Sequence, residues 1–290
     1  GTSASVSCTY GDDGSYPVKG RIFDKDGGSN TYDATASVRN VPPTLTSVFQ
    51  AAPIHEGTAT NIIAQSTDPA EANDPPVYDF DCDNNGSYET PQIPLTSTAD
   101  CFFDDNGNFT VGVRVRDGDG GEDTGSTVAV VNNRAPTAFL ENAGPVDEGS
   151  PATVNFTAQF DPSDADTTAG FHYAYDCTGG SLAATYANSG TADSVECTYP
   201  DEGNYAVSGR IIDKDDGAAD YTANVNVVNV PVEIIELTLT SVDPISVSPL
   251  TIEEADIVTL DVEITDPGIL DVHTFTVNWG DGAPEVVTVP

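Results

Sequence analysis

The sequence has little positive charge. Nine Lys and Arg residues stand against 47 Asp and Glu residues, which gives a formal net charge of −38 over 290 residues. Such a field repels phosphate backbones and anionic lipid headgroups, so it argues against nucleic-acid and membrane-surface binding. Because the carboxylates also repel one another, a compact fold requires bound cations or salt. Cations are therefore the expected partners.

Long apolar runs and catalytic signatures are also lacking. No stretch reaches the roughly 18 uninterrupted apolar residues that a membrane-spanning helix needs. The three His residues do not recur at equivalent positions, and neither a G-x-S-x-G nor an H-E-x-x-H motif occurs. The many carboxylates lie in turns rather than in an apolar cleft. We therefore expect a protein without enzymatic activity.

An internal repeat organises the chain. Three segments that begin at Cys8, Cys101 and Cys197 share an aromatic strand followed by an acidic turn. The Asp that opens this turn recurs at intervals of 93 and 96 residues, at Asp24, Asp117 and Asp213. The repeat divides the chain into the back half of a first repeat (1–41), complete second and third repeats (42–133 and 134–230) and the front half of a fourth (231–290). We expect a window on a longer repetitive protein.

Each complete repeat has the pattern of a β-sandwich. Short runs of alternating apolar and polar residues are separated by turn-rich clusters at spacings near ten residues. No 11-residue stretch carries a helical stripe. The second repeat is predicted to hold six strands, near residues 44–49, 60–66, 77–82, 99–103, 109–116 and 124–131.

Several motifs resemble one known family. The pattern G-x-[YF]-x-V precedes each acidic turn, as in Gly14, Tyr16 and Val18, and the fourth repeat holds the turn Trp279-Gly280-Asp281-Gly282. These motifs resemble those of the PKD (polycystic kidney disease) type domain, an immunoglobulin-like sandwich common in surface and secreted proteins. The resemblance implies an all-β chain of tandem immunoglobulin-like (PKD-type) β-sandwiches.

Four of the five cysteines form two equivalent pairs. Cys82 and Cys101 are 19 residues apart, Cys177 and Cys197 are 20 apart, and Cys8 matches the second member of each pair. Matched spacing favours disulfides, and with them an oxidising extracellular or cell-surface location, over metal thiolates, which would need C-x₂-C clustering. Free buried thiols are the alternative.

Carboxylates are predicted to gather at one end of each sandwich, where the loop between the second and third strands meets the loop between the last two. A hard cation with six to eight oxygen ligands would relieve their repulsion, and Ca²⁺ is the expected ion. The alternative is that these Asp residues only form Asx and Gly turns. The predicted ligands are Asp68, Asp74, Asp117 and Asp119 in the second repeat, and Asp161, Asp164, Asp166, Asp213 and Asp215, with Asp216 beside them, in the third.

A second candidate site resembles the first half of an EF-hand loop. Asp81, Asp83, Asn85 and Glu89 stand at positions 1, 3, 5 and 9, and Gly86 stands at position 6, where the loop turns sharply. The acidic residue at position 12 is missing. A substitute would have to come from elsewhere, such as Glu56 or Asp104.

These features predict a calcium-stabilised structural or adhesive repeat protein of the cell surface or matrix, part of a fibre or surface layer. Its expected partners are copies of itself or other surface and matrix proteins, with polysaccharide as a further candidate. The edges near residues 44–49 and 234–240 lack Lys, so neighbouring chains can add strands there. The alternative function is a spacer or polysaccharide-binding region of a large secreted hydrolase.

Overall fold

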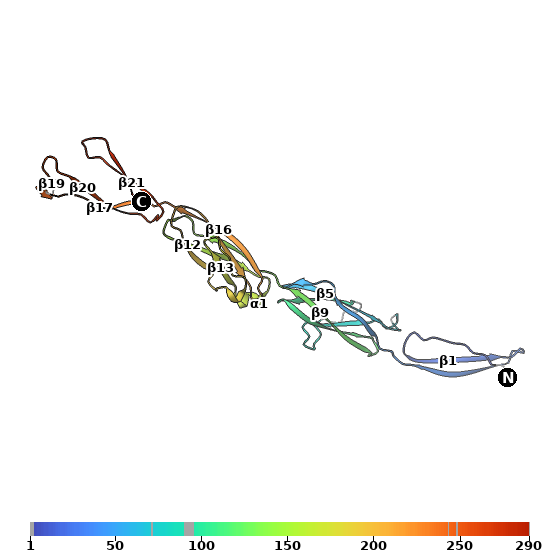
Figure 1. The fold of residues 1–290 in the computed structure, drawn as a ribbon. Helices are drawn as coiled ribbons and strands as arrows, with labels where there is room; N and C mark the ends of the chain where they lie inside the picture. Colours follow the sequence, from blue (N-terminus) through green and yellow to red (C-terminus); the bar gives the residue numbers. More distant parts are fainter. Residues whose placement is uncertain (1–2, 71, 90–95, 243, 248, 290) are drawn as a thin grey trace. The chain divides into compact units, whose positions relative to one another are not determined.

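The computed structural model describes residues 3–70, 72–89, 96–242, 244–247 and 249–289. They fold into two compact units (Figure 1). Unit 1 comprises Gly1–Arg134 with Pro162–Thr168, and unit 2 comprises Ala135–Asp161 with Ala169–Pro290. Each unit contains one complete two-sheet sandwich, so the prediction of tandem immunoglobulin-like β-sandwiches is confirmed. The division into four repeats stays a prediction.

The sandwich of unit 1 consists of a three-stranded and a four-stranded sheet. All neighbouring strands are antiparallel except for one short parallel pair, β4 (Ile54–His55) with β9 (Glu122–Asn132). The first sheet has the order β3 (Thr44–Gln50), β5 (Thr58–Thr67), β7 (Thr98–Phe103). The second has the order β4 (Ile54–His55), β9 (Glu122–Asn132), β8 (Gly107–Arg116), β6 (Val77–Asp81). All six strands predicted for the second repeat are present.

Alternation along the strands produces the core of this sandwich. In β8, Val111, Val113 and Val115 are buried, while the residues between them are only partly buried. They pack with Ile62 and Phe80 from opposite sheets in one apolar cluster. The period of two residues in the sequence thus becomes the inward face of a sheet.

A paired charged residue is also buried in this sandwich. Asp79 on β6 is 2% exposed, and it accepts hydrogen bonds from Arg114 Nε (3.1 Å) and Arg116 Nε (2.8 Å) on β8. Arg114 lies over the ring of Tyr88, with its guanidinium carbon 4.4 Å from the ring centroid. Two guanidinium groups thus hold one carboxylate inside the sheet.

Unit 1 begins with a hairpin of β1 (Gly14–Phe23) and β2 (Ser29–Val38). These strands pair only with each other among the described residues, and most of their side chains are exposed. They correspond in the repeat to β8 and β9, which lie inside the four-stranded sheet. The hairpin positions the acidic residues that precede it, Asp12 and Asp13, within unit 1.

Unit 2 repeats the same sandwich. One sheet has the order β10 (Thr137–Asn142), β12 (Pro151–Phe160), β14 (Ser194–Thr198). The other has the order β11 (Val146–Asp147), β16 (Ala218–Val228), β15 (Gly203–Ile212), β13 (His172–Asp176). A single turn of 3₁₀ helix, η1 (Tyr186–Asn188), lies between β13 and β14. Because the two sandwiches have equivalent topology, the sequence motifs recur at nearly the same spacing in both repeats.

A short helix was not predicted from the sequence. α1 (Asp164–Ala169) follows the Asp161-Pro162 turn, and its residues up to Thr168 belong to unit 1. The Ser163 hydroxyl accepts a hydrogen bond from the Asp166 N–H at 3.1 Å, as an N-cap residue does. Asp104 of the same unit accepts hydrogen bonds from the N–H groups of Asp164 (2.8 Å) and Ala165 (3.1 Å). Polar capping interactions therefore stabilise α1. The helix has no apolar face, so the hydrophobic periodicity of the sequence did not predict it.

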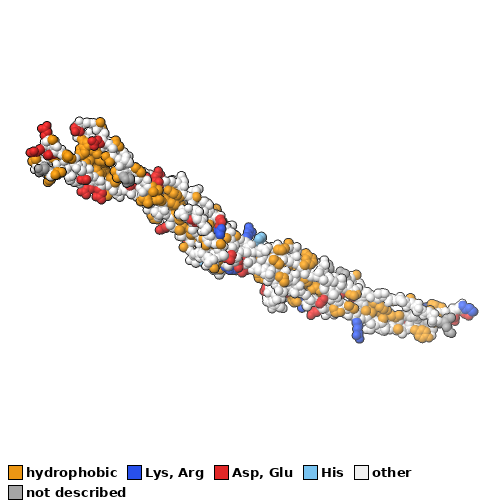
Figure 2. Space-filling view, viewed as in Figure 1, with side chains coloured by type: hydrophobic (Ala, Val, Ile, Leu, Met, Phe, Trp, Pro, Cys, Tyr) orange, Lys and Arg blue, Asp and Glu red, His pale blue; other side chains and the backbone are white. Residues whose placement is uncertain are grey.

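The C-terminal part of unit 2 contains three two-stranded pairings. They are β17 (Glu233–Ser241) with β20 (Val258–Thr265), β18 (Ser246–Val247) with β19 (Leu250–Thr251), and β21 (His273–Val277) with β22 (Glu285–Val289). Large apolar side chains on these strands are exposed, among them Ile234, Leu237 and Val286. Figure 2 shows the resulting hydrophobic area near the C-terminal end.

Both predicted disulfides are present, which confirms their assignment from the repeat. Cys82–Cys101 and Cys177–Cys197 have Cα–Cα distances of 5.5 and 5.8 Å. Cys101 and Cys197 lie in the two cores, whereas Cys8 is exposed and free. Cys82 and Cys177 directly follow β6 and β13, and each bond joins that position to the next strand of its sandwich, β7 or β14.

Replacing Cys177 and Cys197 together by Ala is expected to lower the free energy of unfolding by about 3 kcal/mol, the chain-entropy estimate for a loop of this length. Urea denaturation of the purified chain measures the loss. Cys8→Ser serves as the control and should leave the midpoint unchanged, because this thiol has no disulfide partner. Equal midpoints for the double variant and the control would contradict a stabilising role for the bond.

Candidate metal centres

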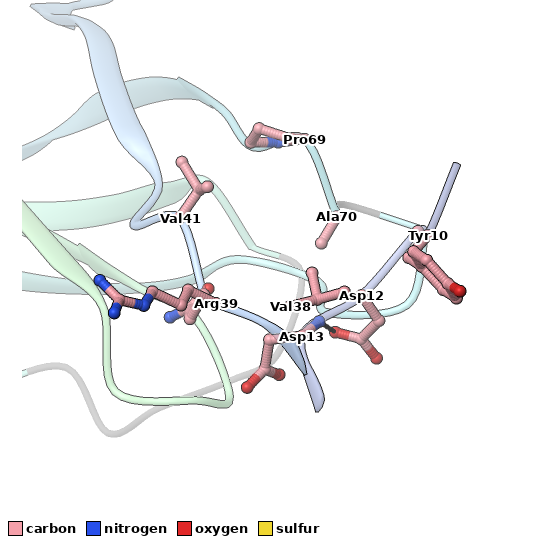
Figure 3. A pocket seen from close by; sticks show the side chains of 10 residues that line it. Tyr10, Asp12, Asp13, Val38, Arg39, Val41, Pro69 and Ala70 are labelled. Carbon is pink, nitrogen blue, oxygen red and sulfur yellow. Dashed lines mark hydrogen bonds between the residues drawn. The ribbon is translucent and has the colours of Figure 1, made fainter. Parts of the chain in front are cut away.

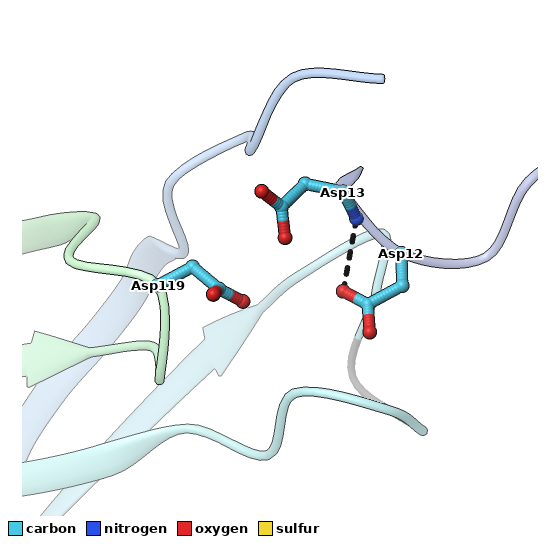
Figure 4. A group of neighbouring side chains, drawn as sticks. All are labelled: Asp12, Asp13 and Asp119. Atoms are coloured by element: carbon cyan, nitrogen blue, oxygen red, sulfur yellow. Dashed lines mark hydrogen bonds between the residues drawn. The ribbon is translucent and has the colours of Figure 1, made fainter. Parts of the chain in front are cut away.

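Unit 1 brings acidic residues from distant parts of the sequence together. Asp12 and Asp13 precede β1, and Asp119 lies in the turn between β8 and β9. Each offers a carboxylate oxygen, and these oxygens all lie within 4.8 Å of one another (Figure 4). Tyr16 fixes the backbone here, since its hydroxyl donates to the carbonyl oxygens of Asp12 (3.1 Å) and Asp13 (2.9 Å).

The loop after β5 adds a fourth carboxylate. Asp74 is 6% exposed, and its Oδ1 accepts a hydrogen bond from the Gly118 N–H at 2.5 Å, one residue before Asp119. We refer to Asp12, Asp13, Asp74 and Asp119 as the first acidic cluster. Asp68 opens the same loop and accepts a hydrogen bond from the Ala70 N–H at 2.6 Å.

Electrostatic repulsion within the first acidic cluster acts on the pKa of Asp119. The pKa of Asp119 is raised, mainly by the charge of Asp13, then by desolvation and by the charges of Asp74 and Asp12. Among the described residues, neither Asp12, Asp13 nor Asp119 forms an ion pair with a Lys or Arg side chain. The adjoining shallow pocket includes Arg39, whose side chain points away from Asp12 and Asp13 in this view (Figure 3). A cation would relieve the repulsion.

The recurring D-x-D turns have a structural role of their own. In each, the first Asp closes the turn by accepting hydrogen bonds from the N–H groups two and four residues later. The residues that do so are Asp24, Asp117 and Asp213. Asp117 also accepts a hydrogen bond from Asn40 Nδ2 at 2.8 Å through its other oxygen. Turn formation therefore accounts for the first Asp of each motif, and the second Asp of each motif is exposed.

The predicted ligands of the third repeat are divided between the two units. Asp161, Asp213 and Asp215 belong to unit 2, where Asp161 is 4% and Asp213 0% exposed. Asp215 forms an ion pair with the neighbouring Lys214, and Asp216 accepts a hydrogen bond from the Tyr186 N–H at 2.8 Å.

Asp164 and Asp166 lie in the segment that belongs to unit 1. Asp166 is fully buried there, and one of its oxygens lies within 4.8 Å of a carboxylate oxygen of Glu56, which is also fully buried. Glu56 Oε1 accepts a hydrogen bond from the Arg134 N–H at 2.6 Å. Two carboxylates thus share a buried part of this unit.

The EF-hand-like loop folds around its first residue. Asp81, 4% exposed, accepts hydrogen bonds from the N–H groups of Asn85 (3.1 Å) and Gly86 (2.9 Å), and Gly86 has the positive φ of 87° that the sharp turn requires. Carboxylate oxygens of Asp81, Asp83 and Glu89 lie within 4.8 Å of one another. Desolvation acts to raise the pKa of Asp83, but hydrogen bonds from Asn85 lower it below its ordinary value.

The two residues considered as a twelfth ligand of this loop have other partners. Glu56 binds the backbone of Arg134, and Asp104 caps α1. Glu89 instead closes the loop, because its Oε2 accepts a hydrogen bond from the Cys82 N–H at 2.7 Å and its own N–H donates to the Phe80 carbonyl oxygen at 3.0 Å. The loop is therefore held by its own residues.

Asp12 and Asp13 were not among the ligands predicted from the sequence. Asp12 and Asp13 lie in the turn before β1. From the sequence, we expect ligands at the other end of each repeat, in the loop that follows the strand equivalent to β1. The repeat itself carries the missing signal, since an Asp stands two residues before the Gly that opens this strand in each of three repeats: Asp12, Asp105 and Asp201. Carboxylates of one repeat thus meet those of the next in unit 1.

Comparison with known proteins gives distant similarities. No protein-family model and no curated protein matches the chain. Among solved structures, Drosophila N-cadherin EC1-4 is 14% identical, with a TM-score of 0.28, over 93% of this chain and 73% of that one. The fibronectin(III)-like modules of Clostridium thermocellum CbhA are 18% identical, with a TM-score of 0.25, over 64% and 93%. SGBP-B of the Bacteroides ovatus mixed-linkage glucan utilization locus is 17% identical, with a TM-score of 0.27, over 84% of this chain and 66% of that one.

In the described part of the chain, no helix is both long enough and apolar enough to cross a lipid bilayer.

Proposed function

We propose that this chain is a non-catalytic structural or adhesive protein of the cell surface or matrix, in which Ca²⁺ stabilises tandem sandwiches that assemble into a fibre or surface layer. The observation that carries the proposal is the first acidic cluster. Asp12 and Asp13 come from one sequence repeat and Asp74 and Asp119 from the next, and the carboxylates of Asp12, Asp13 and Asp119 meet within 4.8 Å. A hard cation binding there would hold one repeat against its neighbour.

Other observations support a location outside the cell and a role without catalysis. Two disulfides favour an oxidising environment. The three His residues have different neighbours: His55 Nδ1 is 3.1 Å from the Asn133 carbonyl oxygen, His172 stacks on Tyr186, and His273 Nδ1 is 3.9 Å from Asp266 Oδ2. These separate contacts support the proposal that the His residues do not form one catalytic group.

Assembly is supported by unprotected strand edges. β3 is an edge strand of its sheet, and β17 pairs on one side with β20. Neither strand contains Lys or Arg, although such residues commonly block edges against further pairing. Apart from the Leu45 N–H, which donates to Asp123 Oδ2 at 2.8 Å, backbone N–H and C=O groups along these edges suit the addition of a strand from another copy.

Electron microscopy of the purified chain in Ca²⁺ is expected to show regular fibres or lattices that dissociate in chelator. Thr44→Lys, which places a charge on the edge strand β3, should reduce assembly several-fold at equal protein concentration. Thr153→Lys on β12, the central strand of its sheet, is the matched control and should assemble normally. Isolated chains at every calcium concentration would contradict the assembly proposal.

A further inference from the structure

Unit 2 contains a second group of carboxylates, none of which is among the ligands predicted from the sequence. Glu148 lies in the turn between β11 and β12, and Asp201 and Glu202 lie in the turn between β14 and β15. Each offers an oxygen, and these oxygens all lie within 4.8 Å of one another. The Tyr205 hydroxyl donates to the Asp201 carbonyl oxygen at 3.0 Å, which fixes this turn as Tyr16 fixes Asp12 and Asp13.

Glu148 distinguishes this group from an ordinary acidic surface. Its side chain is 1% exposed. Oε1 accepts a hydrogen bond from the Val230 N–H at 2.7 Å, whereas Oε2 is buried and has no hydrogen-bond partner among the described residues. A buried carboxylate oxygen without a partner destabilises a fold unless a cation or another donor satisfies it.

The loop after β20 approaches this oxygen. Gly268 is buried, and a Cβ atom at its position would lie 2.9 Å from Glu148 Oε2 and 2.7 Å from Asp271 Oδ2. Both oxygens therefore border the same small space, which a side chain at residue 268 would fill. The Ile269 N–H donates to the Pro200 carbonyl oxygen at 3.2 Å and so ties the loop to the turn that carries Asp201.

The charges of this group have no positive partner in the described part of the chain. Among the described residues, Glu148, Asp201, Glu202 and Asp271 form no ion pair with Lys, Arg or His. Oxygens of Glu148, Asp201 and Glu202 lie within 4.8 Å of one another, and Asp271 Oδ2 borders the same space as Glu148 Oε2. The four carboxylates are thus close enough to repel one another.

We propose that Glu148, Asp201, Glu202 and Asp271 bind one Ca²⁺ ion. All four ligands are carboxylate oxygens, which suit a hard cation, and Ca²⁺ accepts the irregular, partly bidentate coordination that three separate turns supply. The ion gives Glu148 Oε2 its missing partner. It also joins the sandwich of β10–β16 to the loop that leads into β21, and thereby fixes the C-terminal strands of unit 2. This site goes beyond the proposed function and does not depend on the first acidic cluster.

Equilibrium dialysis with radioactive Ca²⁺ on the full chain tests the site. Glu148→Gln keeps the shape of the side chain and an oxygen for the Val230 N–H, and it is expected to bind one ion fewer per chain than the wild type. Glu196→Gln removes the same charge from an exposed position on β14 and should bind the wild-type number. Equal ion counts for wild type and Glu148→Gln would overturn the proposal.

Hydrogen exchange measured by mass spectrometry locates the ion. Ca²⁺ is expected to slow exchange at least several-fold in peptides that cover residues 146–149, 199–204 and 266–271 of the wild type, and not in Glu148→Gln. Asp271→Asn, a second variant at a partly exposed residue, should also lose this protection even if Glu148→Gln fails to fold. Protection that persists in Asp271→Asn would overturn the assignment. Protection that is lost only near residues 12 and 119 concerns the first acidic cluster, so the two sites are distinguished.

Discussion

Removal of Ca²⁺ by a chelator at fixed ionic strength is expected to lower the midpoint of thermal unfolding by more than about 10 °C. A ligand present at 100 times its dissociation constant stabilises a fold by about 2.7 kcal/mol per site. One kcal/mol moves the midpoint of a domain of this size by about 4–8 °C. The first acidic cluster makes the effect large, because without an ion Asp13, Asp74 and Asp12 all act on Asp119, whose pKa they raise.

Calorimetry of two matched variants separates specific binding from screening. Asp119→Asn should remove part of the calcium effect, since its carboxylate belongs to the cluster. Asp26→Asn changes the equivalent second Asp of the D-x-D turn between β1 and β2, which is exposed and paired with Lys25, and should keep the whole effect. If added NaCl raises the unfolding midpoint of the chelator-treated chain to the value measured in Ca²⁺, the carboxylates need only general charge screening, and specific calcium binding is contradicted.

The strands and disulfides follow from local pattern and from the repeat. The alternation in residues 109–116 corresponds to β8, which the structure extends by two residues to Gly107. The equivalent positions of the two Cys pairs in the repeat predicted both disulfides, because two residues that are close in one copy of a fold are also close in the other copy. These patterns are local or repeated in the sequence. Strands and disulfides can therefore be predicted without knowing which residues of one repeat contact the next.

The make-up of the acidic groups could not be predicted in the same way. The sequence places Asp74 and Asp119 at one end of a sandwich, but only the structure brings Asp12 and Asp13 to them. The buried Oε2 of Glu148 likewise depends on a loop more than a hundred residues away. Turn chemistry also competes for the same residue type, as Asp117 and Asp213 show by closing their own turns. Asp content alone therefore does not separate a ligand from a turn former.

Asp79→Ala is expected to destabilise the sandwich of unit 1 by roughly 3 kcal/mol, which is the lower end of the cost of removing one partner of a buried ion pair. The variant leaves Arg114 and Arg116 on β8 without the carboxylate that receives their hydrogen bonds. Their side chains are 29% and 27% exposed, so water reaches them in part, and this keeps the loss at the lower end.

The repeat provides the matched control for this variant. Arg210 corresponds to Arg114 and pairs with Asp220 at 2.6 Å, but Asp220 is on the neighbouring strand and its side chain is 57% exposed. Asp220→Ala should therefore cost less than about 1 kcal/mol, as exposed ion pairs do. Urea denaturation monitored by circular dichroism gives both values. Similar losses of unfolding free energy in the two variants would show that burial of Asp79 adds nothing to its pairing. A loss near 3 kcal/mol confined to Asp79→Ala identifies this carboxylate as the residue that neutralises two arginines inside the sheet.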